Sequence, residues 1–276
     1  MSSKLLIFKF GGGVGIDLES LSKNAAKLQK EFGERIIIVV GANAELSRIQ
    51  KERGVEPKMI TSERGEKSRF TDSATLELLK EVYGGTAEEV AELIRKSGGE
   101  AVAQIASKDN LILAKRHDRM RILEDGKVKV IDGDLTGSIQ KVDVAAIRKI
   151  LDSKKILVLT PPAATKDFST NSKKKIEVNV DGDKIASRIA VELKAEKLIF
   201  FSNTSGLLQN VNDETSLVSE IPTWQANEFA IGRMKKKVLA AKRAIEAGVG
   251  EVIFADGRIG KDPIDSALKG VGTRVF

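Results

Sequence analysis

The sequence predicts an α/β protein built as a three-layer α-β-α sandwich with a mostly parallel central sheet. Short apolar runs alternate along the chain with longer segments of helical period, which is the pattern of consecutive βα units. Most of these runs are apolar at consecutive positions, as expected of strands covered on both faces. With 276 residues, the chain is long enough for one large α/β domain.

The elements follow from these patterns in chain order. The predicted strands are Leu5–Phe10, Ile36–Val40, Ala101–Ile105, Ile156–Leu159, Leu198–Phe201 and Val252–Phe254. The predicted helices are Leu18–Phe32, Ser73–Val82, Asp143–Leu151, Lys184–Leu193 and Met234–Ala247. Asp17 and Asp72 precede two of the helices as candidate N-caps, and Gly248 follows another as a candidate C-terminal cap.

A hairpin is predicted where the sequence departs from the βα rhythm. The segment Met120–Ile131 alternates apolar and polar residues on both sides of Asp125-Gly126, which is a type I′ turn signal. We recognise no repeat and no long linker, and Lys173–Lys175 with its polar neighbours is the best candidate for a joint. We therefore expect a single domain over residues 1–276 with two lobes.

Composition restricts the chemistry that the chain can perform. It contains no cysteine and one histidine, which excludes a disulfide framework, a Cys-ligated metal site and a thiolate nucleophile. His117 alone cannot form a site of several imidazoles, so an enzyme here would use mainly carboxylates and lysines. No run of residues has the length of a signal peptide or a membrane span. We expect a cytoplasmic protein with no membrane partner.

The balance of charge leaves two interpretations open. Lys+Arg number 46 against 39 Asp+Glu, for a net charge of +7, which favours acidic partners such as nucleotides, nucleic acid or an acidic protein. The same charge could belong to a solvated surface rich in Lys and Glu. Aromatic residues make up only 4% of the chain, so platforms for base stacking are scarce and no nucleic-acid partner is expected.

Two turns of small residues follow the first two predicted strands. Lys9 lies near the end of the first strand, and the run Gly11-Gly12-Gly13 would let backbone N–H groups approach a phosphate. The second strand ends at Gly41-Ala42-Asn43. Ligands bind at the carboxyl ends of the strands in open α/β sheets, so the two turns could form a cradle. The first turn matches neither common phosphate-binding motif, and a plain tight turn remains the alternative.

Charged residues stand close to three predicted helix starts. Arg69 could bind a carboxylate through two hydrogen bonds, or could be an ordinary surface arginine near a cap. Asn179 and Asp183 precede the start of the predicted helix Lys184–Leu193, where such residues commonly act as caps. Lysines at Lys235–Lys237 oppose the helix dipole at a cost of a few tenths of a kcal/mol each unless an anion is held there. Such a local mismatch is typical of a functional site.

Taken together, these motifs resemble the amino acid kinase family, which includes acetylglutamate kinase, aspartokinase and carbamate kinase. The resemblance extends from about Leu5 to Val275 and is carried by GVEPKMITSERGEKSRFT, GDLTGSIQKVD, NVDGDKIASRIA, MKKKVLAAKRAIEAGV and KDPIDSALKGVGT. The chain looks most similar to archaeal and thermophile kinases that phosphorylate aminoadipate or glutamate on a small acidic carrier protein, in lysine and arginine biosynthesis. The resemblance implies an amino acid kinase-like fold, with the acceptor in lobe 1–175 and the nucleotide in lobe 176–276.

The resemblance also implies roles for individual residues. Lys9 and Lys237 would stabilise the transferring phosphoryl group, and Asp183 would organise both lysines. The implied acceptor-binding residues are Gly41, Ala42, Asn43, Arg69 and Asn179. The implied nucleotide-binding residues are Gly11, Gly12, Ser202, Asn203, Gly206 and Met234. ATP and Mg²⁺ are the implied substrate and cofactor, and no metal-ligating residue is predicted.

The sequence departs from the family pattern at several turns. Val40–Asn43 occupies the position of a His-Gly-Gly-Gly turn in the family, so two added Cβ atoms would lie where backbone approaches the substrate. The histidine that isopentenyl phosphate kinases use in this turn is missing. Ala106–Asn110 replaces a glycine-rich turn of the family pattern. Ser202-Asn203 replaces a Ser/Thr-Asp pair, and Arg233 replaces a glycine. Two hypotheses remain: an ATP-dependent carboxylate kinase that forms an acyl phosphate, and a non-catalytic nucleotide-binding paralogue.

Predictions about partners follow from the resemblance and from the basic segments. An acidic carrier would dock on the hairpin Met120–Ile131 and its cations, which we take to be Lys115, Arg116, Arg119, Lys127 and Lys129. A solvated hairpin with no partner is the alternative. The family implies a homodimer. Trp224 is predicted to be a core or lid residue, or alternatively an adenine contact.

Overall fold

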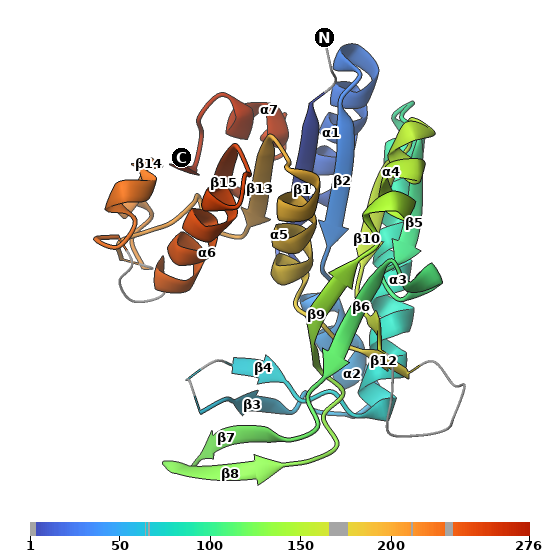
Figure 1. Cartoon of the computed structure of the whole chain (residues 1–276), viewed down its shortest axis with the longest axis vertical. Helices are drawn as coiled ribbons and strands as arrows, with labels where there is room; N and C mark the ends of the chain where they lie inside the picture. Colours follow the sequence, from blue (N-terminus) through green and yellow to red (C-terminus); the bar gives the residue numbers. More distant parts are fainter. Residues whose placement is uncertain (1–3, 64, 66, 166–175, 211, 230–233) are drawn as a thin grey trace.

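The computed structural model describes residues 4–63, 65, 67–165, 176–210, 212–229 and 234–276. Its main sheet has eight strands in the order β14-β16-β15-β13-β1-β2-β10-β5 (Figure 1). Their bounds are β1 Leu5–Phe10, β2 Arg35–Val40, β5 Ala101–Ile105, β10 Ile156–Thr160, β13 Lys197–Ser202, β14 Glu220–Ile221, β15 Glu251–Asp256 and β16 Thr273–Val275. All neighbours pair in parallel except β15 and β16. The predicted mostly parallel sheet is confirmed.

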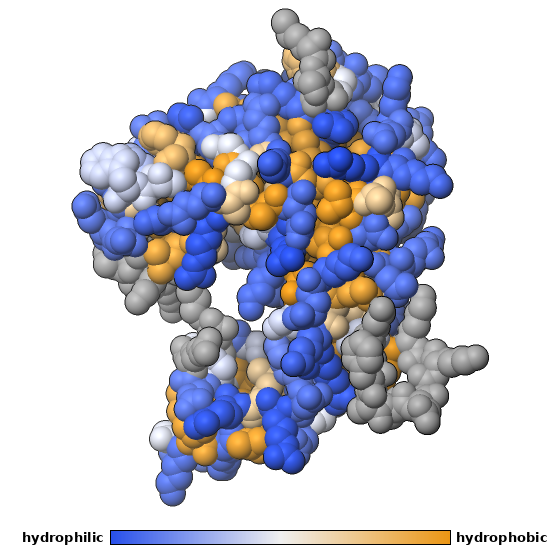
Figure 2. Space-filling view, viewed as in Figure 1, coloured by the Kyte–Doolittle hydropathy of each residue, from blue (hydrophilic) through white to orange (hydrophobic). Residues whose placement is uncertain are grey.

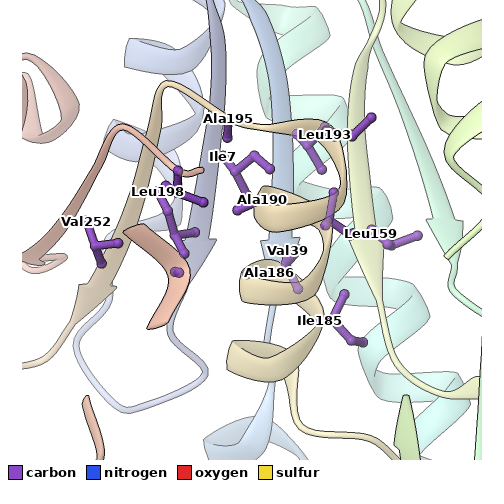
Figure 3. Packing of buried hydrophobic residues seen from close by; sticks show 14 of the residues in the cluster. Ile7, Val39, Leu159, Ile185, Ala186, Ala190, Leu193, Ala195, Leu198 and Val252 are labelled. Atoms are coloured by element: carbon purple, nitrogen blue, oxygen red, sulfur yellow. The ribbon is translucent and has the colours of Figure 1, made fainter. Parts of the chain in front are cut away.

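Helices cover both faces of the main sheet. They are α1 Leu18–Phe32, α3 Ser73–Lys96, α4 Val144–Asp152, α5 Gly182–Leu193, α6 Met234–Glu246 and α7 Pro263–Leu268, whereas α2 Asn43–Glu52 packs on α3. Alternate strand residues enter two separate cores because side chains alternate across a strand. Ile7 and Val39 pack with α4, α5 and α6, and Figure 3 shows this core around α5. Phe8 and Ile38 pack with α1, α3 and α7, which completes the three predicted layers.

Smaller sheets lie beyond the carboxyl ends of the central strands. One has four strands in the order β12-β11-β6-β9, with bounds β6 Ile112–Arg116, β9 Gly137–Val142, β11 Ala163–Thr165 and β12 Ile176–Val178. Two hairpins pair β3 Met59–Thr61 with β4 Lys67–Arg69, and β7 Met120–Glu124 with β8 Lys127–Ile131. The hairpins extend side by side at the lower end of the molecule in Figure 1, and Ser62 bridges to Ile122.

Several element ends follow from local sequence signals. The Asp17 side chain accepts a hydrogen bond from the Ser20 amide, and Asp72 accepts one from Thr75, so both predicted N-caps are confirmed. In the predicted hairpin, Asp125 and Gly126 have φ values of 52° and 71°. A type I′ turn requires positive φ at both central positions, which Gly adopts readily and Asp tolerates.

Helix α3 is longer than predicted because it continues from Val82 to Lys96 through a glycine pair. Glycine has low intrinsic helix propensity, which favours a helix end before the glycine pair. The predicted end at Val82 was nevertheless wrong. Tertiary packing explains the continuation: Ala87, Val90 and Ile94 are buried against the main sheet. Most helical stability in proteins comes from such packing of one face, which outweighs the propensity cost here.

The predicted joint at Lys173–Lys175 lies outside the described residues. On either side of it, β11 pairs antiparallel with β12, and both belong to the four-stranded sheet. The division into lobes 1–175 and 176–276 stays a prediction. None of the helices in the described ranges is long and apolar enough to cross a membrane.

Candidate active site

The first predicted catalytic lysine lies where the central strands end. Lys9 is 7% exposed, and its ammonium lies 3.3 Å from Oδ1 of Asp183 at the start of α5. The same ammonium donates a hydrogen bond of 3.1 Å to the carbonyl of Phe10. The carboxyl ends of β1 and β13 point toward a hollow in the surface between the body that carries α6 and the two hairpins (Figures 1 and 2). A buried cation at such an edge is suited to binding an anion.

Helix α5 presents Asp183 without using its carboxylate as a cap. Asp181 is the N-cap, and its side chain accepts hydrogen bonds from the amides of Asp183 and Lys184 at 2.7 and 3.2 Å. Because Asp181 satisfies these amides, the Asp183 carboxylate remains available to Lys9. A Cβ added to Gly182 would lie 2.9 Å from Cε of Lys9, so a larger residue there would require the Lys9 side chain to shift.

The second predicted lysine, Lys237, is influenced by the same pair. Burial of its ammonium lowers the pKa of Lys237, Asp183 acts to raise it, and the charge of Lys9 lowers it further. Lys237 as a whole is exposed, whereas its ammonium lies 5.7 Å from the centroid of the Phe254 ring. The structure therefore groups two cations around one carboxylate, as the resemblance implied.

The first glycine turn fits closely against the second turn. A Cβ added to Gly12 would lie 2.6 Å from the backbone nitrogens of both Ala42 and Asn43, a distance that real Cβ atoms do not show. The Ala44 amide also donates a hydrogen bond of 2.7 Å to the Gly12 carbonyl. The two turns are thus in direct backbone contact, and the predicted cradle depends on glycine at position 12.

The side chains that replace glycines in the second turn differ in burial. Ala42 is 4% exposed and packs with Leu46 and Leu79 between α2 and α3. The Asn43 side-chain oxygen accepts a hydrogen bond of 2.9 Å from the Tyr83 hydroxyl. Burial raises the pKa of Tyr83 to about 12, so the hydroxyl remains a donor. Asn43 as a whole is exposed and only Ala42 is enclosed between α2 and α3, so the expected obstruction of the substrate by the two Cβ atoms stays a prediction.

Arg69 is held in place by one face of α2. Its guanidinium donates to Oε1 of Gln50, to the Ser47 hydroxyl at 2.7 Å and to the Asn43 carbonyl at 3.4 Å. Arg69 is 9% exposed, and its Nε has no hydrogen-bond partner among the described residues. Burial lowers its pKa, with a small opposing effect from Tyr83. Because no carboxylate neutralises this buried cation in the described part of the chain, it is suited to an anionic ligand.

Asn179 lies at the opposite end of the same neighbourhood. Its side-chain amide donates a hydrogen bond of 3.3 Å to the hydroxyl of Thr71, two residues after Arg69. Its backbone bonds to Leu135 and Gly137, which lead into β9. The predicted acceptor residues Arg69 and Asn179 are thereby brought together from distant parts of the sequence.

The predicted nucleotide-binding residues surround the end of β13. The Gly11 amide donates to the carbonyl of Phe201, and the Ser202 hydroxyl lies 3.1 Å from that of Thr204. The Asn203 amide nitrogen lies 3.6 Å from the position that a Cβ of Gly13 would occupy. At Gly206 a Cβ would lie 2.7 Å from both Leu217 and Thr273. Met234 begins α6, and its side chain lies outside the described part of the chain.

Comparison with known families decides the membership of this chain. The sequence profile described as "Amino acid kinase family" matches residues 4–256. The chain belongs to the amino acid kinase family. The resemblance inferred from the motifs is therefore confirmed, and so is the predicted enzyme class, a kinase.

Relatives within the amino acid kinase family cover nearly the whole chain. A protein from Deinococcus radiodurans named "[LysW]-aminoadipate kinase" is 41% identical over 275 residues, which is 98% of this chain and 91% of that protein. A protein of the same name from Thermus thermophilus is 38% identical over 277 residues, covering 98% of this chain and 100% of the relative. These names agree with the predicted carrier-linked subgroup.

Solved structures of the family share the fold at low sequence identity. An N-acetylglutamate synthase from Neisseria gonorrhoeae has a TM-score of 0.75 at 23% identity over 99% of this chain; the chain spans only 59% of that longer protein. A Giardia carbamate kinase has a TM-score of 0.67 at 15% identity and is covered to 99%. These likenesses confirm the predicted amino acid kinase-like fold.

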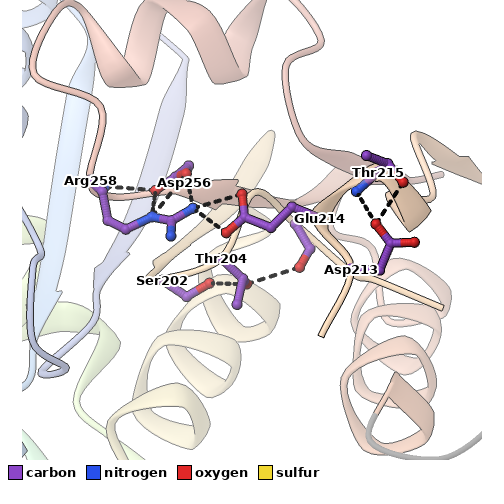
Figure 4. Close-up of polar contacts among 8 residues, drawn as sticks. Ser202, Thr204, Asp213, Glu214, Thr215, Asp256 and Arg258 are labelled. Atoms are coloured by element: carbon purple, nitrogen blue, oxygen red, sulfur yellow. Dashed lines mark hydrogen bonds and ion pairs between the residues drawn. The ribbon is translucent and has the colours of Figure 1, made fainter. Parts of the chain in front are cut away.

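One prominent residue of the predicted nucleotide lobe was not recognised from the sequence. Arg258, just after β15, binds both carboxylate oxygens of Asp256 and reaches Glu214 at 2.9 and 3.2 Å (Figure 4). Burial would raise the pKa of Asp256, but hydrogen bonds from Arg258 bring it below its usual value. The ion pairs link the end of β15 to the segment that follows β13. The only sequence signal was Asp-Gly-Arg after a predicted strand.

A pocket of about 580 Å³ lies away from Lys9, beside the altered turn Ala106–Asn110. Its lining is Gly84, Ala87, Glu88, Ala103, Gln104, Ile105, Ser107, Lys108, Asp109 and Glu177. The Ser107 hydroxyl donates to Oε1 of Glu177 at 2.5 Å, and Lys80 binds the other oxygen at 2.6 Å. The altered turn is therefore linked to β12 and α3.

Trp224 differs from its predicted burial. It is 74% exposed and lies in the short 3-10 helix Thr223–Gln225. The prediction of a core residue was wrong, because this segment is attached at the edge of the main sheet through β14 and a bond from the Thr223 amide to Phe276. The alternatives of a lid residue or an adenine contact stay predictions.

Proposed function

We propose that the chain is an ATP-dependent kinase that phosphorylates a side-chain carboxylate of an amino-acid acceptor, in lysine or arginine biosynthesis. The single observation that carries the proposal is the Lys9–Asp183 contact, with Lys237 beside it, at the same strand ends as the buried cation of Arg69. The family and the names of its relatives support the same reaction class.

The chemistry needs positive charge and positioning more than acid–base groups. An acceptor carboxylate oxygen bonds to the γ-phosphorus of ATP while the bond from that phosphorus to the bridging oxygen breaks, which releases ADP and an acyl phosphate. No proton has to move, since the attacking group is already an anion. Lys9 and Lys237 offset the repulsion between the two anions and stabilise the equatorial oxygens of the phosphoryl group.

Mg²⁺ fits this site as a companion of the nucleotide. The described residues contain no group of three or more His, Cys, Asp or Glu side chains able to hold a metal ion. Mg²⁺ commonly takes one or two carboxylates together with substrate phosphates and water. Asp183, whose side chain is 55% exposed beside Lys9, is the carboxylate that would face it, and the bound ion would screen phosphate charge.

For the acceptor, we favour aminoadipate attached to a carrier protein through its amino group. The relatives at 41% and 38% identity carry the name [LysW]-aminoadipate kinase. In such a substrate the α-carboxylate remains free, and Arg69, whose Nε has no hydrogen-bond partner among the described residues, would bind it while Asn179 would contact the linking amide. Glutamate on the same carrier is the alternative acceptor.

The paired hairpins are the surface on which we place the carrier. Arg119 and Lys127 are exposed there, although Arg119 already pairs with Asp132, and Lys115 is exposed on β6 of the four-stranded sheet. Val128 and Val130 of β8 are 44% and 59% exposed and form an apolar strip on the opposite face of that strand from Lys127. A small acidic protein would gain both electrostatic steering and apolar burial on such a surface.

We also expect the protein to be cytoplasmic and to form a homodimer, as the resemblance to the family implies. Among the described strands, β5 pairs only with β10 and is an edge of the main sheet, which leaves one side for a second copy. Light scattering coupled to size exclusion should give twice the chain mass; a monomer at micromolar concentration would contradict the expectation.

The reaction is tested by trapping its product. The protein is incubated with Mg-ATP, hydroxylamine and one acceptor at a time: acetylglutamate, free aminoadipate, or carrier-linked aminoadipate and glutamate. We expect hydroxamate with carrier-linked aminoadipate and little with the free amino acid. Nucleotide binding by calorimetry without hydroxamate from any acceptor would favour the non-catalytic paralogue instead.

A further inference from the structure

Asp134 is a buried carboxylate in the loop before β9 to which no role has been assigned. It is 2% exposed, and its Oδ1 accepts a hydrogen bond of 2.8 Å from the Thr71 amide. Its Oδ2 accepts one from the Thr136 hydroxyl. None of the ion pairs among the described residues includes it. Burying a carboxylate without a cation is costly, so its hydrogen bonds to Thr71 and Thr136 have to compensate for the lost solvation.

The partner of Asp134 links the two predicted acceptor-binding residues. The Thr71 hydroxyl accepts from the Asn179 side chain at 3.3 Å and donates to the carbonyl of Arg69 at 3.2 Å. The Leu135 amide, directly after Asp134, donates to the Thr71 carbonyl at 2.7 Å. The Asp134 segment therefore holds Thr71 from both its amide and its carbonyl.

The same segment also holds Asn179 by its backbone. The Asn179 amide donates to the Leu135 carbonyl at 2.8 Å, and the Gly137 amide donates to the Asn179 carbonyl at 3.0 Å. The ends of β4 and β12, which are distant in the sequence, thus meet on one short stretch before β9 (Figure 1). The position of Arg69 relative to Asn179 depends on this stretch, because no direct hydrogen bond between these two side chains is present among the described residues.

We propose that Asp134 is a positioning residue of the acceptor site, which fixes Thr71 and thereby sets the distance and orientation between Arg69 and Asn179. The inference rests on the proposed function, since it assumes that these two residues bind the acceptor. Asp134 itself acts only through Thr71. An acceptor held at both ends is sensitive to the spacing of its contacts, and a misplacement of about 1 Å can cost on the order of 100-fold.

Steady-state kinetics with ATP and carrier-linked aminoadipate varied separately test this role. Asp134→Ala should raise the acceptor KM by about 10- to 100-fold and leave the ATP KM within about twofold, because Lys9 and the glycine turns are untouched. Thr71→Val should move the acceptor KM in the same direction, since it removes the hydroxyl that bonds to Asn179.

Asp134→Asn is the conservative rescue. Its amide oxygen can accept from the Thr71 amide, while its NH₂ group can donate to a rotated Thr136 hydroxyl. We expect the acceptor KM of this variant to return to within about threefold of the wild-type value. If Asp134→Ala does not fold, the opposite behaviour of Asp134→Asn and Thr71→Val still supports the proposal, and equal behaviour of these two variants overturns it.

Asp143→Ala is the matched control. Asp143 caps α4 by accepting a hydrogen bond of 3.0 Å from the Ala146 amide, away from Thr71. It should lower the melting temperature without changing the acceptor KM. If Asp134→Ala behaves like this control, Asp134 is only structural and the proposal fails while the proposed function stands. A wild-type protein that phosphorylates none of the acceptors overturns both.

Discussion

At the scale of single residues, the site is defined by cations that the described protein neutralises only in part. Lys9 has Asp183 as its carboxylate neighbour, and Lys237 shares that neighbour. Among the described residues, Arg69 is buried with neutral hydrogen-bond partners only. Unbalanced positive charge in a partly desolvated site disfavours the empty protein and favours a bound anion, which is the requirement for joining a carboxylate to a phosphoryl group.

Removing either lysine should slow the chemical step. We expect Lys9→Ala and Lys237→Ala each to lower kcat by about 10²- to 10³-fold, by analogy with the loss of one charge-stabilising donor in a preorganised site. Hydroxamate formation measures the rate, and circular dichroism checks the fold. Lys96→Ala, on an exposed lysine at the end of α3, is the control. Wild-type kcat in both site variants would remove these lysines from the mechanism.

The lowered pKa of Lys237 predicts an alkaline limit to activity. The ammonium must be protonated to stabilise the phosphoryl group, and burial shifts its loss of the proton to lower pH than in an ordinary lysine. As pH rises through this lowered pKa, kcat should decrease. The decrease should therefore occur at a lower pH than the pKa of about 10.4 that is typical of lysine. A pH profile of kcat measures this. A rate that stays constant to that pH would contradict the prediction.

At the scale of elements, the site is formed by two turns and a helix start that touch through backbone. Gly12 lies against the nitrogens of Ala42 and Asn43, and Gly182 lies against Lys9. Helix α3 closes the other side of the second turn, where it receives the side chains of Ala42 and Asn43. These contacts explain how the turn departs from the family pattern in sequence and still leaves its backbone next to the first turn.

Substitution of Gly12 should therefore damage both stability and activity. The Cβ of Gly12→Ala would clash with the backbone nitrogens of Ala42 and Asn43, so the backbone of the second turn would have to shift. We expect the free energy of unfolding to decrease by about 1–3 kcal/mol. Urea denaturation measures it, and the ATP KM should rise as well. Gly85→Ala is the control, because a Cβ there meets nothing within 4 Å inside α3. It should stabilise by about 0.5–1 kcal/mol. Equal effects of the two changes would be inconsistent with the clash.

At the scale of the whole molecule, the hairpins place charge and apolar surface beyond the strand ends where the site lies. Their arrangement beside the hollow in Figure 2 would let a docked protein present a tethered acceptor to Arg69. The net charge of +7 supports attraction of an acidic partner over distances comparable to the Debye length, about 8 Å at physiological salt.

Reversal of hairpin charges should slow carrier binding without harming the site. We expect Lys115→Glu with Lys127→Glu to lower the association rate with the carrier about 10-fold or more at low salt and to flatten its salt dependence. Stopped-flow measurements at two salt concentrations give both quantities. The same number of reversals at Lys30 and Lys96, which lie on α1 and α3, controls for net charge. An association rate equal to that of this control would place the carrier elsewhere.

The sequence by itself determined the α/β class, the main strands, several helix caps and the identity of the family motifs, since these depend on local periodicity and short-range hydrogen bonding. It did not determine the full length of α3, the burial of Ala42, the Arg258 ion pairs or the exposure of Trp224. Each of these depends on residues far apart in the chain. The approach of Asp134, Thr71 and Asn179 is of the same kind: only folding brings three distant segments within hydrogen-bonding distance, so only the tertiary structure decided how the candidate acceptor site is held together.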